Sequence, residues 1–463
     1  MVSVGRHPNI TLLSYSEVEK VSGYVGNFTV TVRRKPRYVD EKLCTGCGTC
    51  LEKCPWKKFP SEFDLGLGSR PAIYTPFPQA VPRVPVIDPL QCAYFKNGKC
   101  KACEKFCPRE AIDFKQQEQH LEIEVGAIIL ATGFHDFDPQ RAARYGYGRL
   151  ENVITSLELE RLVNTGGPTA GKVLLKNGQP PQKVAVLHCV GSRGPEHEYC
   201  SRVCCMVSLK LATLVRDYIG AQVVEFYRDL RAFGKGYEAF YEQTGRHGVT
   251  FLRYDRDIRV EPRDGKLAVL ITDVYTGEPL ETVVDLVVLS TGLEPQPDQH
   301  EQAALFGVSR SPDGFFLEKH PKLAPVETTT DGVYLAGACQ GPKDIPDSVA
   351  QGAAAAAAAL SLIDAGSVAL EPFTTYVNAA QCGNCQTCAG LCPYGAIATV
   401  PFEGRLAAEI NPVLCKGCGA CAAACPAGAI IQNGFTNDEL LAEIEGILSI
   451  VGATGASPVA EAA

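Results

Sequence analysis

All but one of the 21 cysteines in this 463-residue chain fall into short, regularly spaced groups. The first group reads Cys44-Thr-Gly-Cys47-Gly-Thr-Cys50-Leu-Glu-Lys-Cys54-Pro55. Three thiolates at this close spacing wrap one 4Fe-4S cube, while the fourth, which precedes proline, reaches a second cube. The group therefore predicts a two-cluster module that needs a second run of cysteines to complete it.

A second run follows and completes a module of the bacterial ferredoxin type. It places residues 93–99 between its first two cysteines, a longer spacer than the usual pair of residues. Crossed ligation between the two runs predicts one cluster on Cys44, Cys47, Cys50 and Cys107, and another on Cys54, Cys92, Cys100 and Cys103.

Near the C-terminus two further runs have ideal spacing, and each ends in Cys-Pro. Crossed ligation predicts one cluster on Cys382, Cys385, Cys388 and Cys425, and another on Cys392, Cys415, Cys418 and Cys421. Structural zinc also uses Cys-x-x-Cys pairs. Because zinc gives no reason for a third close cysteine or for the proline after the fourth, the repeated pattern favours clusters.

Four more cysteines lie close together in the middle of the chain. They are Cys189, Cys200, Cys204 and Cys205. Cys189 ends an apolar strand that starts at Lys183, where a dinucleotide-binding unit would carry its glycine-rich turn. A redox disulfide between Cys204 and Cys205 is the alternative, but four cysteines this close favour a fifth 4Fe-4S cluster and argue against NAD binding there.

Three segments between the modules resemble parts of flavin disulfide-reductase-like proteins. Segments 124–133 and 285–292 are apolar, predict buried strands and end in Ala-Thr-Gly and Ser-Thr-Gly. Segment 330–337 precedes a helix expected from about Pro346, whose N-terminus would suit a phosphate. We expect FAD at Ala131, Thr132, Gly133, Gly292, Gly337, Ala338, Ile345, Pro346 and Asp347.

The glycine-rich turn that usually opens a flavin domain has no counterpart here. No Gly-x-Gly-x-x-Gly follows a first strand. The adenine-binding half of the site is therefore expected on another polypeptide, unless the chain holds no flavin by itself. The remaining cysteine, Cys339, is expected to be a buried structural thiol beside the flavin-type loop.

Taken together, these residues resemble the A-type subunits of heterodisulfide reductase, iron-sulfur flavoproteins of methanogenic archaea and many anaerobic bacteria. The resemblance extends to about Gln432. It is carried by the stretches KPRYVDEKLCTGCGTC, PFPQAVP, VGAIILATGF, CVGSR, YCSRVCCM, RAFGKGYEAFY, DGFFLEKHPKL and GPKDIPDSVAQ.

This resemblance implies an α/β fold: a thioredoxin-reductase-like flavoprotein with an incomplete FAD domain, a degenerate NAD-type domain, and an inserted and a C-terminal two-cluster ferredoxin domain. The expected boundaries are 1–36, 116–165 and 291–368 for the FAD-type domain, 37–115 for the inserted ferredoxin domain, 166–290 for the NAD-type domain with its cluster, 369–435 for the C-terminal ferredoxin domain, and 436–463 for a helix and mobile tail.

The family also implies roles for particular residues and partners. Its non-standard cluster maps onto the four central cysteines, and its lysine near the flavin N5 maps onto Lys210, which would otherwise be taken for an ordinary solvated lysine. Full-length members begin with further domains, so we expect a small separate protein to complete the FAD domain. Other implied partners are the B and C subunits, a hydrogenase or formate dehydrogenase module, ferredoxin, and a second copy in a homodimeric core.

The implied function is flavin-based electron bifurcation. The flavin would accept an electron pair and pass the electrons singly, one toward a high-potential disulfide and one toward low-potential ferredoxin. A self-sufficient NAD(P)H-dependent flavin dehydrogenase would need two dinucleotide turns, and the sequence has neither. A flavin-free relay subunit of another anaerobic redox complex is the remaining alternative.

Composition limits the other classes of function. The formal net charge is -8, and five clusters would bring it to about -18, which suits basic redox partners and argues against nucleic acid. The N-terminus lacks the pattern of a secretion signal, and clustered thiols suit a reducing cytoplasm. No apolar run reaches the roughly 20 residues of a membrane span, so we expect a cytoplasmic protein without a direct span.

Overall fold

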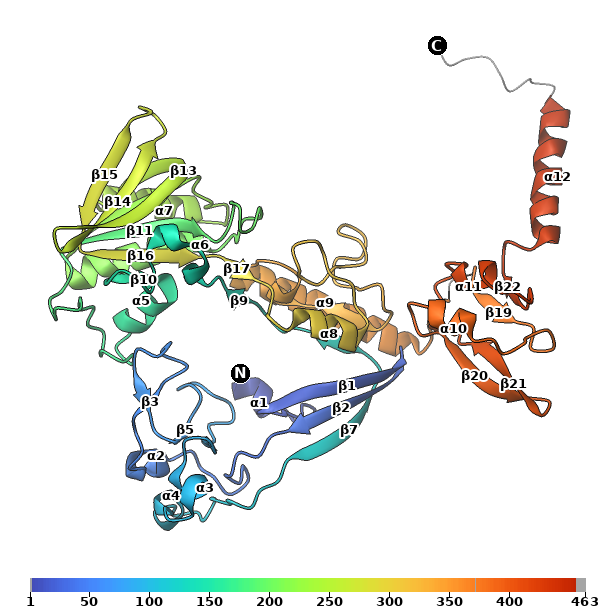
Figure 1. Cartoon of the computed structure of the whole chain (residues 1–463), viewed down its shortest axis with the longest axis horizontal. Helices are drawn as coiled ribbons and strands as arrows, with labels where there is room; N and C mark the ends of the chain where they lie inside the picture. The colour runs from blue at the N-terminus through green and yellow to red at the C-terminus, as the bar shows by residue number, and fades with distance from the viewer. Residues whose placement is uncertain (1, 371, 455–463) are drawn as a thin grey trace.

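The computed structural model describes residues 2–370 and 372–454. Figure 1 shows three lobes: a large sheet lobe, the inserted cysteine module beneath it, and the C-terminal cysteine module at the far end of a long helix. The helix is α9 (Ile345–Ala365). The expectation of a mobile tail falls on residues 455–463, which lie outside the described residues, while α12 (Asn437–Thr454) forms the expected helix before it.

The N-terminal part is a short helix followed by an antiparallel sheet. The elements are α1 (Val2–Gly5), β1 (Ser16–Tyr24), β2 (Asn27–Arg34) and β7 (Gln119–Val125), with strand order β1-β2-β7. The inserted module leaves the sheet after β2 and returns at β7. Its elements are α2 (Thr49–Lys53), β3 (Phe59–Pro60), β4 (Ser69–Arg70), β5 (Ile73–Tyr74), β6 (Val86–Ile87), α3 (Ala93–Asn97) and α4 (Ala102–Lys105).

Segment 124–133, expected to be one strand, is divided between two sheets. β7 ends at Val125 and pairs with β2, whereas β8 (Ile128–Leu130) starts after Gly126 and runs parallel to β18 (Val333–Leu335). The expectation of a single strand was therefore wrong, because the chain changes sheets at Gly126-Ala127. This region also contains two short paired strands, β9 (His135–Asp136) and β17 (Leu293–Glu294), and one α-helix, α8 (Gln299–Phe306). It has three single-turn 3-10 helices: η1 (Pro139–Arg141), η2 (Ala143–Tyr145) and η4 (Gly337–Cys339).

The large lobe is built on a seven-stranded sheet with the order β10-β16-β11-β12-β13-β14-β15. The first five strands in this order are parallel to one another, whereas the last two continue the sheet through antiparallel pairs. The strands are β10 (Val153–Thr155), β11 (Lys183–Val190), β12 (Gln222–Tyr227), β13 (Thr250–Arg263), β14 (Lys266–Asp273), β15 (Pro279–Val284) and β16 (Leu286–Thr291). The helices are α5 (Ser156–Val163), α6 (Cys204–Leu214), η3 (Val215–Ile219) and α7 (Tyr237–Arg246).

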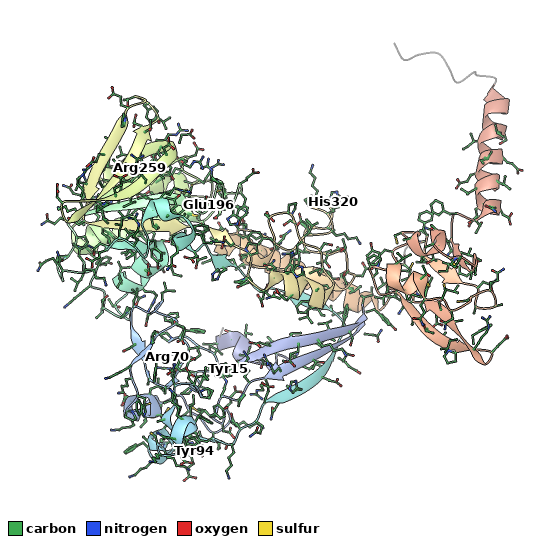
Figure 2. The ribbon with its side chains drawn as sticks, viewed as in Figure 1. Tyr15, Arg70, Tyr94, Glu196, Arg259 and His320 are labelled. Atoms are coloured by element: carbon green, nitrogen blue, oxygen red, sulfur yellow. The ribbon has the colours of Figure 1, made fainter. Side chains whose placement is uncertain are left out.

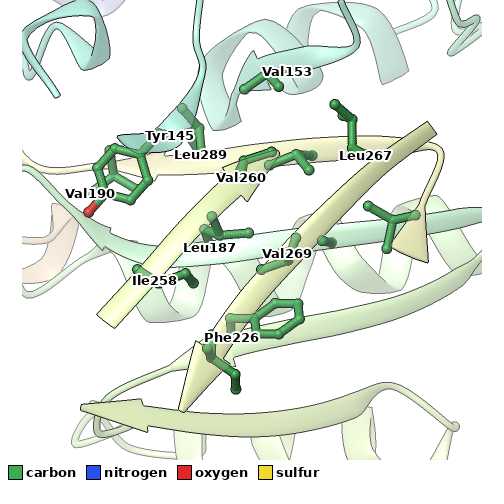
Figure 3. Packing of buried hydrophobic residues seen from close by; sticks show 14 of the residues in the cluster. Tyr145, Val153, Leu187, Val190, Phe226, Ile258, Val260, Leu267, Val269 and Leu289 are labelled. Carbon is green, nitrogen blue, oxygen red and sulfur yellow. The ribbon is translucent and has the colours of Figure 1, made fainter. Parts of the chain in front are cut away.

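One domain boundary differs from the expected one. β10 pairs with β16 in the large sheet, although residues 116–165 were assigned to the FAD-type domain. The core of the sheet includes Leu187, Phe226 and Leu289, whose side chains interdigitate with those of β13 and β14 (Figure 3). Strands β11 and β16 were expected as buried apolar strands, and their burial confirms this.

The C-terminal module consists of two small strand pairs and two short helices. β19 (Thr375–Val377) pairs with β22 (Ile430–Gln432), and β20 (Ile397–Phe402) pairs with β21 (Arg405–Ile410). The helices are α10 (Thr387–Leu391) and α11 (Ala420–Ala423). The mixed α/β architecture with an inserted and a C-terminal module agrees with the expected fold class.

Helix α9 joins strands β8 and β18 to the C-terminal module. By length and composition it is the one helix of the described residues that could cross a membrane, yet only 11% of its most apolar window is buried. The helix is longer than the alanine tract, but polar residues such as Asp347, Gln351 and Asp364 interrupt its apolar sequence. Ile345, Val349, Leu360 and Ile363 are exposed along it, so a large apolar face has no cover within the described chain.

Candidate functional site

In the inserted module, one crossed set of cysteines surrounds a common cavity. Its lining includes Cys44, Cys47, Cys50 and Cys107. Burial, with added repulsion from the neighbouring thiols, raises the pKa of Cys50 to about 12. Iron would have to displace this proton, since only the thiolate binds metal. The cavity between four thiols of two different runs suits a bridging cluster.

The second set of the inserted module is also brought together. Burial raises the pKa of Cys103 to about 12, and Cys92 and Cys54 add to the shift. The long spacer after Cys92 forms α3, which ends at Gly98 with φ +71°. A single helical turn thus takes up the extra residues. Tyr94 of this turn stacks on Phe114, with ring centroids 3.9 Å apart. Figure 2 shows Tyr94 at the lower end of the inserted module.

The C-terminal module repeats this arrangement. A second cavity is lined by Cys382, Cys385, Cys388 and Cys425. In the last set, Thr375 joins two of the cysteines, because its Oγ1 lies 3.5 Å from Cys415 Sγ and 3.7 Å from Cys421 Sγ. Cys392 follows α10 directly, and α10 packs against α11, which carries Cys421. In the inserted module α2 and α4 pack together in the same way.

A backbone hydrogen bond recurs at the fourth cysteine of three runs. The amide of the residue four positions later donates to Sγ in the pairs Ala111–Cys107, Ala396–Cys392 and Ala429–Cys425, at 3.3, 3.4 and 3.3 Å. Such donors stabilise negative charge on sulfur and help set cluster potentials. Cys54 differs, since its Sγ lies 3.7 Å from the carbonyl oxygen of Trp56.

The four central cysteines lie where the parallel strands end. Cys189 is in β11, and Cys204 and Cys205 form the first turn of α6. Cys204 Sγ lies 3.8 Å from the carbonyl oxygen of Thr291 at the end of β16. Burial raises the pKa of Cys189 to about 11, and Cys205 and Cys200 add to the shift. All four thiols therefore share one neighbourhood.

This neighbourhood is the crevice that dinucleotides use in open parallel sheets, outside the carboxyl ends of the strands. Gly191 follows β11 with φ +79°, as a nucleotide-binding turn requires. A Cβ at this position would lie 2.1 Å from the ring of Phe137, however, so the glycine is needed for packing against an aromatic ring. The turn thus packs against an aromatic ring on one side, while Cys189, Ser192 and Arg193 line a cavity beside it.

The expected flavin contacts are divided between two places. Gly133 and Gly337 follow the parallel strands β8 and β18, and both have φ +75°. A Cβ on Gly133 would meet nothing within 4 Å, and the buried Oγ1 of Thr132 has no hydrogen-bond partner. The backbone at Gly133 is therefore accessible to a ligand, and Thr132 Oγ1 has an unused hydrogen-bonding capacity. Gly292 is different, because it packs against Ser192 and Ser201 of the central cysteine segment.

The other expected flavin residues lie around the start of α9. Ala338 is buried, whereas Ile345 and Pro346 are exposed. Asp347 accepts a hydrogen bond from Arg202, which lies between Cys200 and Cys204, at 2.6 Å. The start of α9, expected near Pro346, is confirmed at Ile345. Arg202 therefore joins the central cysteine segment to the N-terminus of this helix.

Two single residues remain from the sequence-based expectations. Cys339 is fully buried, with Sγ 3.3 Å from the carbonyl oxygens of Leu130 and Ala336, which confirms a structural thiol. Lys210 lies on the exposed side of α6, with Nζ 3.4 Å from Glu160 Oε1. The structure thus places Lys210 against α5, and its expected role near flavin stays a prediction.

Sequence reasoning missed two polar residues beside the central cysteines. His188 and Arg193 flank Cys189, and each has a buried nitrogen without a hydrogen-bond partner. A histidine within the otherwise apolar run Lys183–Val190 was the available signal. Across the described chain, no three His, Cys, Asp or Glu side chains converge as one metal ion would require.

Two family models match the cysteine modules. A "4Fe-4S binding domain" matches residues 37–57, and a "4Fe-4S dicluster domain" matches residues 381–429. These matches confirm the expectation of ferredoxin-type modules at both places.

Curated relatives match nearly the whole chain, and all three described here are A-type subunits. One iron-sulfur protein of this type from the CoB--CoM heterodisulfide reductase of Methanopyrus kandleri is 52% identical over 96% of this chain and 68% of its own length. The counterpart in the H(2):CoB-CoM heterodisulfide,ferredoxin reductase of Methanothermobacter marburgensis is 48% identical over 97% and 67%. The counterpart in the ferredoxin:CoB-CoM heterodisulfide reductase of Methanosarcina mazei is 42% identical over 86% and 50%.

Among solved structures, a thioredoxin reductase of T. acidophilum aligns with a TM-score of 0.34 and 15% identity, over 53% of this chain and 68% of that chain.

Proposed function

The chain belongs to the family of heterodisulfide reductase A-type subunits, and from this premise we propose that it carries electrons through five 4Fe-4S clusters and a shared FAD within a heterodisulfide reductase-like complex. The observation that carries the proposal is the grouping of thiols. Two crossed sets surround cavities, and the central set occupies the crevice at the ends of β11 and β16. Because clusters exchange one electron at a time, the chain would provide more than one path for single-electron transfer.

Each proposed cluster has its own ligand set. The four ferredoxin clusters are assigned to the crossed sets, and the fifth to Cys189, Cys200, Cys204 and Cys205. In the fifth set, burial and then the neighbouring Cys189, Cys205 and Cys200 raise the pKa of Cys204. Four thiols that repel one another as thiolates are a costly arrangement unless a cation neutralises them. An iron-sulfur core provides that neutralisation.

Flavin binding is assigned to the ends of β8 and β18 and to the N-terminus of α9. Open backbone at Gly133 and the unpartnered Thr132 hydroxyl support this assignment. When bound, FAD would convert electron pairs to single electrons. Ala131, Gly337 and the start of α9 would contact the flavin half, while Lys210 would have to leave Glu160 to approach the ring.

The adenine-binding half of the FAD site is assigned to a further segment of protein. The described structure exposes 26265 Å², whereas a compact chain of 49.7 kDa exposes about 17,000 Å². Part of this excess is the apolar face of α9. Relatives are longer than this chain, which spans about two thirds of the length of the first two. We assign the uncovered face to an N-terminal half, carried by a small partner protein.

The remaining partners follow from the proposed complex. The B and C subunits would reduce the disulfide, a hydrogenase or formate dehydrogenase module would supply electron pairs, and ferredoxin would take the low-potential electron. The names of relatives include H2 and ferredoxin as their reactants. A cytoplasmic location and electron bifurcation at the shared FAD belong to the same proposal.

The experiment is anaerobic purification of the chain with and without the protein encoded beside it, followed by iron, sulfide and flavin analysis. About twenty irons per chain, with FAD only in the joint preparation, is the expected result. About twenty irons with no flavin in either preparation would leave a flavin-free relay instead. About four irons or fewer would contradict the cluster assignment itself.

A further inference from the structure

The side chains around the central cysteine set differ from those in the two ferredoxin modules. In the described parts of both modules, the donors to cysteine sulfur are backbone amides and the hydroxyls of Thr49 and Thr375. These groups are neutral. A basic side chain in the C-terminal module, Lys416 beside Cys415, is paired with Asp331. The central set has three basic side chains near it, from His188, Arg193 and Arg228.

His188 lies under the set in the closed interior. Both His188 and Glu225 are 0% exposed, and His188 Nε2 lies 2.9 Å from Glu225 Oε2. The hydroxyl of Tyr254 donates to the carbonyl oxygen of His188 at 2.8 Å and holds its backbone. Nδ1 has no hydrogen-bond partner. Burial raises the pKa of Cys205, but the nearby His188 ring and the backbone of Arg231 lower it overall.

Arg193 follows Cys189 by four residues and lines the same cavity as this cysteine. Its Nη2 donates to Asp229 Oδ2 at 2.6 Å, while the buried Nη1 has no partner. Its charge, followed by that of Arg228, opposes the increase that burial causes in the pKa of Cys189. A buried guanidinium N–H without an acceptor is costly. Sulfur atoms of a bound cluster would provide the missing acceptor.

The backbone also points to a specialised site. Cys189, Arg193 and Arg202 have φ of +59°, +55° and +61°, in the left-handed region that side chains avoid. Such residues cost about 1–3 kcal/mol each and persist where the surroundings fix them. Three of them in one short segment hold the cysteines and the donors in one arrangement. A cavity of about 670 Å³ lined by Arg193, Arg228 and Cys189 opens beside it.

Positive charge and hydrogen bonds to sulfur stabilise the reduced cluster, which carries one more negative charge than the oxidised form. We propose that Arg193 and His188 donate hydrogen bonds to sulfur atoms of a cluster held by Cys189, Cys200, Cys204 and Cys205, and make this cluster easier to reduce than the four ferredoxin clusters. Both are positioning residues. The proposal rests on the fifth cluster of the proposed function.

The test is an EPR-monitored redox titration of the full chain, with iron and sulfide counted in the same samples. The fifth-cluster signal is identified by its loss in Cys200→Ala. In Arg193→Gln we expect this midpoint potential to fall by the equivalent of a tenfold change in the reduction equilibrium, about 59 mV for one electron, with the other four midpoints unchanged. Arg193→Lys should restore part of the shift.

Two further variants keep the result decisive. Asp229→Asn removes the carboxylate that neutralises Arg193, Arg253 and Arg231, so it should raise the same midpoint. Arg263→Gln removes an exposed arginine paired with Glu281 on the far hairpin and should leave it unchanged. If Arg193→Gln does not retain the fifth cluster, the midpoint potential of this cluster in Asp229→Asn is the deciding measurement. An unchanged midpoint in Asp229→Asn would then overturn the proposal.

The iron count separates this proposal from the wider one. About twenty irons in the wild type with an unchanged midpoint in Arg193→Gln would overturn the role of Arg193, and an unchanged midpoint in His188→Gln would overturn that of His188. About sixteen irons in the wild type and no signal lost in Cys200→Ala would remove the fifth cluster, and this inference with it.

Discussion

The guanidinium of Arg161 on α5 donates two hydrogen bonds to the same oxygen of Asp64, with Nε and Nη2 3.0 and 2.8 Å from Oδ1. Asp64 belongs to the inserted module, so this contact joins the module to the large lobe. The guanidinium also lies 4.3 Å from the ring centroid of Phe63. Both partners are mostly buried. The pair therefore fixes the position of two proposed clusters relative to the fifth.

Replacement of Arg161 by glutamine should release this connection. Charge-assisted hydrogen bonds of this kind contribute about 1.5–3 kcal/mol, so local opening of residues 61–68 should become at least tenfold more frequent. Amide hydrogen exchange measures that opening. The control variant Arg263→Gln breaks an exposed ion pair elsewhere and should leave hydrogen exchange in residues 61–68 unchanged. Equal exchange in the two variants would show that the Arg161–Asp64 pair does not hold the inserted module in place.

Crossed ligation can be tested by pairs of alanine substitutions. Cys50 and Cys107 line one cavity, so Cys50→Ala/Cys107→Ala should lose about four irons, no more than either single variant. Cys103→Ala/Cys107→Ala should lose about eight, because these residues belong to different sets. Cys339→Ala is the matched control and should keep all the iron. Equal losses in both double variants would contradict the crossed assignment.

Removal of the clusters should unfold the C-terminal ferredoxin module while the large sheet stays folded. The core of the C-terminal module consists largely of cysteines and alanines, including Cys382, Cys388, Cys421, Ala407 and Ala429. So small an apolar core cannot stabilise a module of this size without its metal. Hydrogen exchange after iron chelation should show loss of protection in 369–435 and retention in β11 and β16. Protection of both 369–435 and the large sheet after chelation would mean that the fold of the module does not depend on its clusters.

A charge on the exposed face of α9 should disrupt the shared flavin site. Val349 is 67% exposed, so Val349→Glu should cause little change in the isolated chain but prevent docking of the missing half. We expect FAD to be lost from the joint preparation while the iron content stays at about twenty. Val283→Glu, on the remote strand β15, is the control. Retention of FAD in Val349→Glu would place the docking surface elsewhere.

The cysteine spacing was sufficient to predict both modules and their crossed sets, because ligand geometry leaves few alternatives for such a pattern. The long spacer after Cys92 could not be interpreted from sequence, since only the structure shows that α3 shortens it. Gly126 gave no signal that the chain changes sheets. His188 and Arg193 were missed because their partners, Glu225 and Asp229, are distant in sequence, and the environment of Lys210 depends on a segment from α5.

The contact between Gly191 and Phe137 has a consequence for where electrons can go. In dinucleotide-binding folds, the glycine-rich turn after such a strand binds the pyrophosphate of the cofactor. Here Cys189 ends the strand, and Gly191 of the turn packs against the ring of Phe137. In the proposed function, electrons on the clusters of this chain would therefore be exchanged with redox centres that partner proteins bring within range, rather than with NAD(P)H.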